Sequence, residues 1–172
     1  PADTSWDSRI YAISPGSAAF LESLGVWQML DATRVTPVYE MAVFGAGHEN
    51  DSAAQLNFSA YDSGLPELAF IVENRQLQAA MWNALKRQQN VTIFCPAQCD
   101  SITWDEAHDK LHLADGKVLQ AALIVGADGM DSWVRKQAGI EVTQHPYQQI
   151  GVVANFSTEQ SHRNIAHQWF RQ

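Results

Sequence analysis

Two hydrophobic periods run along the chain, and together they predict helices as well as strands. A first helix is expected after Ser14, which can cap it, with Pro15 at its first position and Gly25 near its end. A second helix is predicted from Asn74 to about Gln88. Its apolar residues recur at helical spacing on one face, namely Leu77, Met81, Ala84 and Leu85.

Short apolar or alternating runs predict strands between and after these helices. The longer runs are residues 38–44, 55–60, 68–72, 91–94, 117–125 and 149–156, and two shorter ones are 102–104 and 110–113. Asp115 and Gly116 form a strong hairpin-turn signal between neighbouring runs. The mixture predicts an α/β (α+β mixed) fold with mixed and antiparallel pairing rather than a regular βαβ array.

Composition indicates a folded body and excludes some partners. Apolar residues make up 46% of the 172 residues and charged residues 17%, so we expect residues 1–172 to form a single compact fragment. The net charge is −8 and no Lys/Arg cluster occurs, which argues against a nucleic-acid partner. No apolar run is long enough to span a membrane, and the opening residues do not resemble a secretory signal. Two cysteines fit a reducing cytoplasm.

The segment from residue 123 to residue 135 carries the most specific chemistry. A buried strand is expected to lead into a turn with two glycines, Gly126 and Gly129, where backbone can approach a ligand closely. A short helix then follows, and its free N–H groups would favour a phosphate. Asp128 can accept hydrogen bonds from a ribose, and Arg135 can bind phosphate or carboxylate. The alternative is an ordinary strand-turn-helix in which the Asp is a cap.

The pattern Gly-Ala-Asp-Gly-x-x-Ser-x-Val-Arg at residues 126–135 resembles the Asp-Gly fingerprint of the flavoprotein aromatic hydroxylases, the para-hydroxybenzoate hydroxylase superfamily. Residues 7–14, the run Leu24-Gly25-Val26-Trp27, residues 71–74 and residues 166–170 are similar to segments of its ubiquinone-biosynthesis hydroxylases. The resemblance covers nearly the whole chain. It implies that the chain combines a mixed or antiparallel substrate-side sheet with a piece of the FAD-binding domain.

The resemblance also implies cofactors and residues that contact them. In that family the Asp-Gly segment lies near the flavin pyrophosphate and is implicated in NAD(P)H use. Mapped here, it implies cofactor-binding roles for Asp128, Gly129, Ser132 and Arg135. Two arginines, Arg9 and Arg75, stand where the family approaches the flavin. An arginine in the first turn of a helix also opposes the helix dipole, which hints at another role for Arg75.

Residues 36–72 and 146–172 are expected on the substrate side, and residues 1–35 and 73–145 on the FAD-domain side. Two family elements are not in the sequence: no Gly-x-Gly-x-x-Gly turn for the ADP half of the flavin precedes Pro1, and no Gly-Asp dipeptide follows Gly139. We therefore interpret the chain as an internal fragment that alone binds no cofactor and is inactive. Self-association through surface left uncovered is a further expectation.

Two other patterns imitate known sites. Residues 45–50 begin like a dinucleotide-binding turn, but the sixth position is Asn and a polar run follows, so a loop is the preferred interpretation. Cys95, Cys99, His108 and His112 imitate a zinc finger. The gap between Cys99 and His108 is too short for one, and no zinc is expected.

The parent protein is expected to be an FAD- and NAD(P)H-dependent monooxygenase that hydroxylates a polyprenylated phenol in ubiquinone biosynthesis. The flavin would carry the chemistry, while the protein would place the ring and exclude water. A cytoplasmic location is expected, with peripheral membrane contact or contact with a ubiquinone-biosynthesis complex left open. Two alternatives remain: a cofactor-free binding module of the same fold, or another flavoprotein reaction such as epoxidation or halogenation.

Overall fold

The computed structural model describes residues 5–45, 55–105 and 107–170, and these divide into two units that are described separately. Unit 1 contains residues 1–91 and 151–172, and unit 2 contains residues 92–150. The expected α/β (α+β mixed) fold is confirmed, because three helices and three small sheets are interspersed along the described chain. No helix among the described residues has the length and apolarity to span a bilayer.

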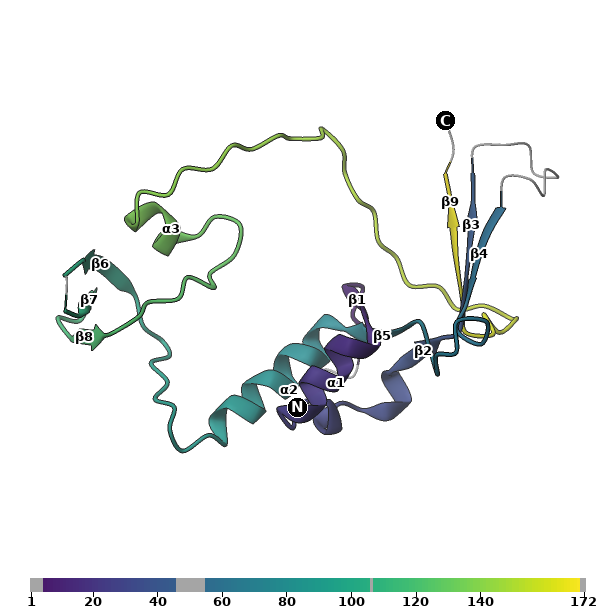
Figure 1. The fold of residues 1–172 in the computed structure, drawn as a ribbon, viewed down its shortest axis with the longest axis horizontal. Coiled ribbons are helices and arrows are strands. Elements are labelled where there is room, and N and C mark those ends of the chain that lie inside the picture. Colours follow the sequence, from purple (N-terminus) through teal and green to yellow (C-terminus); the bar gives the residue numbers. More distant parts are fainter. Residues whose placement is uncertain (1–4, 46–54, 106, 171–172) are drawn as a thin grey trace. The chain divides into compact units, whose positions relative to one another are not determined.

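The first sheet of unit 1 is built around one central strand. Strand β5 (Ala69–Glu73) lies between β1 (Ile10–Ile13) and β2 (Thr36–Val38), and both neighbours run antiparallel to it. Helix α1 (Pro15–Ser23) follows β1, and helix α2 (Asn74–Lys86) follows β5 without a loop (Figure 1). Two short 3-10 helices, η1 (Trp27–Met29) and η2 (Ala32–Arg34), lead from α1 to β2.

Helix α1 begins as its sequence predicts. The Ser14 hydroxyl accepts a hydrogen bond from the Ser17 N–H at 3.2 Å, and Pro15 occupies the first helical position. After the helix, Gly25 adopts a φ of +69°, a left-handed conformation that a residue with a Cβ rarely takes. The chain therefore reverses there and brings Val26 into the core.

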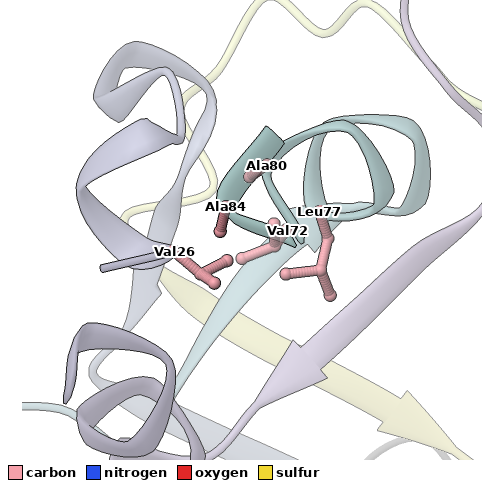
Figure 2. Packing of buried hydrophobic residues seen from close by; sticks show 5 residues of the cluster. All are labelled: Val26, Val72, Leu77, Ala80 and Ala84. Atoms are coloured by element: carbon pink, nitrogen blue, oxygen red, sulfur yellow. The ribbon is translucent and has the colours of Figure 1, made fainter. Parts of the chain in front are cut away.

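The core of unit 1 lies between β5 and α2. Val72 on β5 is fully buried, and Figure 2 shows it beside Val26 and the buried face of the helix, which carries Leu77, Ala80 and Ala84. Trp27 packs edge-on against Phe70, with ring centroids 5.1 Å apart. This packing explains why α2 forms: its apolar stripe is buried against the strand that precedes it.

Two residues of the predicted helix stripe do not enter this core. Met81 and Leu85 are 41% and 38% exposed and line an apolar groove between α1 and α2, together with Phe20, Leu24 and Trp82. The groove has a volume of about 800 Å³. The spacing thus predicts the helix correctly, but the buried face is narrower than the stripe.

A second sheet in unit 1 joins distant parts of the sequence. Strand β3 (Glu40–Phe44) pairs antiparallel with β4 (Gln55–Ser59) and parallel with β9 (Ile165–Trp169), as Figure 1 shows. The run predicted as one strand at residues 38–44 is therefore two strands in two sheets. The change occurs at Tyr39, whose N–H donates to the Asn164 carbonyl and whose carbonyl accepts from the Ala60 N–H.

Unit 2 holds the third sheet and the shortest helix. Strands β6 (Cys99–Thr103), β7 (Asp109–Leu113) and β8 (Val118–Ala121) form an antiparallel meander, and α3 (Trp133–Gln137) follows. The turn predicted at Asp115 and Gly116 is confirmed, with Gly116 at a φ of +86°. Because these strands pair only with one another, the described chain forms two units instead of the single compact fragment expected.

Several sequence-based assignments differ from the structure. Residues 91–94 and 149–156 are not strands, the strand predicted at 117–125 is only β8, and β1 was not predicted. In the described structure residues 91–94 and 149–156 pair with no strand, so apolar character alone does not make them strands. Most of residues 45–50 lie outside the described residues. The division into substrate-side and FAD-side segments stays a prediction.

Candidate functional site

The Asp-Gly turn of unit 2 is organised by a single carboxylate. Asp128 accepts the Trp133 N–H at 2.6 Å and the Val134 N–H at 3.2 Å through Oδ2, and it accepts the Ser132 hydroxyl through Oδ1. The Ser132 hydroxyl oxygen in turn accepts the Arg135 N–H at 3.0 Å. The first N–H groups of α3 are thus already bonded within the turn, contrary to the expectation that they are free for a phosphate.

The glycines of this turn have separate physical reasons. Gly129 adopts a φ of +89°, and nothing lies within 4 Å of the place where a Cβ would stand. Gly126 instead faces α3, because an added Cβ would come within 3.0 Å of the Val134 Cβ. Gly129 therefore leaves an open approach to the backbone, whereas Gly126 permits close packing of the turn on the helix.

These hydrogen bonds also set the charge of the turn. The pKa of Asp128 is lowered from its ordinary value of 3.8, chiefly by the Ser132 hydroxyl and further by the Val134 and Trp133 N–H groups, while desolvation opposes the shift. Asp128 is therefore ionised at neutral pH. Arg135 is half buried, and its guanidinium has no hydrogen bond or ion pair to any residue that the structure describes.

The two arginines predicted from the resemblance lie together in unit 1. The backbone N–H groups of Arg9 and Arg75 both donate to Asp7, each at 3.0 Å, one to Oδ1 and the other to Oδ2. The Arg75 side chain also lies 3.6 Å from the Asp7 carboxylate and donates to the Ser5 carbonyl at 3.2 Å. The Arg9 guanidinium lies over the Tyr11 ring, 6.0 Å from its centroid.

A buried ion pair stands behind these arginines. Glu73 is 5% exposed and is bound by Arg34 through two hydrogen bonds, Nε to Oε1 at 2.7 Å and Nη2 to Oε2 at 2.6 Å. Sequence reasoning missed this pair because its members lie on different elements. The available signal was the acidic residue at the end of an apolar strand, directly before a helix.

The structure therefore assembles the predicted residues as two groups. Arg9 and Arg75 meet at Asp7 in unit 1, whereas the Asp-Gly turn in unit 2 brings together Asp128, Gly129, Ser132 and Arg135. Their roles toward a cofactor stay predictions. Among residues 5–45, 55–105 and 107–170, no group of three or more His, Cys, Asp or Glu side chains could hold a metal. Cys95 and Cys99 are exposed thiols.

Comparison with known proteins identifies relatives that catalyse one class of reaction. The chain is 36% identical over 148 residues to 3-demethoxyubiquinol 3-hydroxylase of Escherichia coli, covering 86% of this chain and 37% of that protein. It is 31% identical over 165 residues to ubiquinone hydroxylase UbiL of Rhodospirillum rubrum, covering 96% and 37%. Human ubiquinone biosynthesis monooxygenase COQ6 is 31% identical over 175 residues, covering 96% and 36%. The chain thus spans about a third of these relatives' length.

Solved structures agree on the fold. PqsL of Pseudomonas aeruginosa in complex with 2-aminobenzoylacetate superposes with a TM-score of 0.64 at 24% identity, covering 85% of this chain and 38% of that one. A variant of HpxO from Klebsiella pneumoniae complexed with FAD superposes with a TM-score of 0.52 at 18% identity, covering 74% and 32%. At these identities the likeness shows the fold alone.

The resemblance to the ubiquinone-biosynthesis hydroxylases is confirmed by these relatives. The family described as the FAD binding domain matches residues 2–172, which is almost the entire chain. The match includes the Asp-Gly turn and both candidate arginines. The chain therefore belongs to the FAD binding domain family.

Proposed function

We propose that this chain supplies part of the FAD-binding domain of an FAD- and NAD(P)H-dependent monooxygenase that hydroxylates a polyprenylated phenol in ubiquinone biosynthesis. The observation that carries the proposal is the family match over residues 2–172, combined with relatives whose names state hydroxylation of ubiquinone precursors. Because a polyprenyl tail is strongly apolar, we place the whole protein at the surface of a membrane or beside other enzymes of the pathway.

The residues present fit a flavin. Gly129 leaves open space beside its backbone, so a flat ligand or its phosphates can approach closely. Arg9 and Arg75 place two cations near the start of α2, where they can neutralise phosphate charge. When bound, the flavin would supply the redox and oxygen chemistry that amino-acid side chains lack.

Within this proposal each element of the chain has a passive but specific task. Asp128 and Ser132 keep the turn at residues 126–132 in one conformation, because their hydrogen bonds close it onto α3. Gly129 presents backbone to the cofactor. The strands β3, β4 and β9 form a sheet that we assign to the substrate side, where it would hold the phenol ring and exclude water.

The proposal is tested on the full-length protein, purified with its natural flanking regions. We expect a yellow protein with stoichiometric FAD that oxidises NAD(P)H when a polyprenylated phenol is added and incorporates one hydroxyl group into the ring. Mass spectrometry of the product separates hydroxylation from epoxidation or halogenation. A full-length protein that binds no flavin in a titration would refute the proposal in favour of a cofactor-free binding module.

A further inference from the structure

Glu73 is placed unlike any other carboxylate among the described residues that form ion pairs. It ends β5, its side chain is 7% exposed, and both of its oxygens are fully used. Oε1 accepts from Arg34 and from the Gln76 amide at 3.1 Å, and Oε2 accepts from Arg34 and from the Asp7 backbone N–H at 2.7 Å. Glu73 makes no side-chain cap hydrogen bond to α2, so its bonds connect separate segments instead.

The bond to Asp7 makes Glu73 the base of a relay. Asp7 receives the carboxylate of Glu73 at its backbone, and its own carboxylate receives the backbone N–H groups of Arg9 and Arg75. Arg34 reinforces the same segment, since its Nη2 donates to the Ser5 carbonyl at 3.1 Å and its guanidinium lies 4.4 Å from the Trp6 ring centroid. Residues 5–9 are thus fastened to the start of α2.

We infer that Glu73 and Asp7 are positioning residues for flavin binding, which fix the backbones of Arg9 and Arg75 so that both guanidinium groups face the same ligand. The inference rests on the proposed function for the identity of that ligand. It assigns no contact between Glu73 and the flavin. Glu73 acts only through Asp7 and Arg34.

The energetics favour a positioning role over simple stabilisation. Burying a carboxylate and a guanidinium costs desolvation that their attraction only offsets when the geometry is good, and a well-packed apolar pair often stabilises a fold equally well. The Arg34–Glu73 pair is bidentate, and such a fork restricts the direction of both side chains. An apolar pair would keep the packing but could not accept the Asp7 N–H.

The first experiment measures the fastening without any cofactor. In the chain as described, Glu73→Gln replaces one acceptor oxygen by an amide that cannot accept from Arg34 or Asp7. We expect hydrogen exchange of the Asp7, Arg9 and Arg75 amides to accelerate about tenfold or more. The Trp133 and Val134 amides in unit 2 serve as the internal control and should not change. Unchanged exchange at Arg9 and Arg75 would overturn the relay.

The second experiment separates positioning from stability in the full-length protein. Glu73→Leu and Arg34→Met alone each leave one buried charge unpaired, so each should lower the melting temperature. The double variant removes both charges and should recover most of that loss. Flavin affinity should nevertheless stay about tenfold or more below wild type, because Asp7 has still lost its acceptor.

The controls make the outcomes distinct. Lys117→Met removes the exposed Lys117–Asp115 pair in unit 2 and should change neither stability nor flavin affinity. Flavin affinity that returns with stability in the double variant would show that the pair is merely structural. If the wild-type full-length protein binds no flavin, the proposed function fails and the positioning role falls with it, whereas the exchange experiment still reports the fastening.

Discussion

Asp128 shows how one side chain can meet two demands that sequence reasoning treats as alternatives. Its carboxylate caps α3, as in an ordinary strand-turn-helix, and in doing so it fixes the conformation of Gly129. This arrangement was readable from sequence, because Asp128 and Ser132 lie four residues apart in one turn. The Arg34–Glu73 pair was not, because 39 residues separate its members and only the folded sheet brings them together.

The charge on Asp128 leads to a prediction about pH. Because its folded pKa is lowered, its stabilisation of the turn should be present above about pH 3.8, its ordinary value, and lost as the pH falls through the lower folded pKa. Asp128→Ala should remove protection from exchange at the Trp133 and Val134 amides at neutral pH. Nuclear magnetic resonance of the isolated chain measures both amides directly.

Asp128→Asn is the matched variant, since its amide oxygen keeps one cap acceptor without the charge. Its protection at Val134 should fall between wild type and Asp128→Ala, and it should not vary between pH 3 and pH 7. Equal protection in wild type and Asp128→Ala would contradict the capping role. In the full-length protein Asp128→Ala should also weaken flavin or NAD(P)H use by about tenfold to a hundredfold.

At the scale of elements, periodicity predicted what is local and missed what depends on a partner. Helix α2 and the turn at Gly116 follow from nearby residues, and both are confirmed. Strand β1 was missed because its burial depends on β5, a partner far along the sequence. The runs 91–94 and 149–156 were predicted as strands for their apolar character, yet a strand also needs a neighbouring edge to bond with.

The central strand β5 provides a test at this scale. Val72 is fully buried between the sheet and α2, so Val72→Ala should lower the free energy of unfolding of unit 1 by about 2 kcal/mol through lost burial and a residual cavity. Val118→Ala on β8 is the matched control, because Val118 is 51% exposed. It should cost less than about 0.5 kcal/mol in urea denaturation. Equal costs for the two variants would contradict the assigned core.

At the scale of the whole molecule, the chain keeps helices and sheets but spans only about a third of its relatives' length. Many large apolar side chains on the described surface are exposed, including Phe20, Leu123, Met130, Ile150, Val152 and Phe156. Exposed apolar surface on this scale favours association. The sequence predicted this outcome through the two missing flavin-holding turns rather than through any single residue.

The isolated chain is therefore expected to be folded, colourless and inactive. Of the three turns that its family uses to hold flavin, the sequence contains the Asp-Gly turn, and each lost charge-assisted contact costs on the order of 1.5–3 kcal/mol. Flavin titration should give a dissociation constant of about millimolar or weaker. Sedimentation should show oligomers whose share rises with concentration. A purified yellow sample, or NAD(P)H oxidation by the chain alone, would contradict this expectation.

The parallel pair of β3 and β9 sets the order in which the molecule can be made. Glu40 pairs with Ile165, so the second sheet of unit 1 stays incomplete until nearly the whole chain has left the ribosome. Unit 2 lies between these partners in sequence and can fold in the meantime, because its strands pair locally. Until β9 arrives, the edge of β3 is open to other chains. Synthesis rate and chaperone supply, rather than final stability, should then govern the yield of native protein.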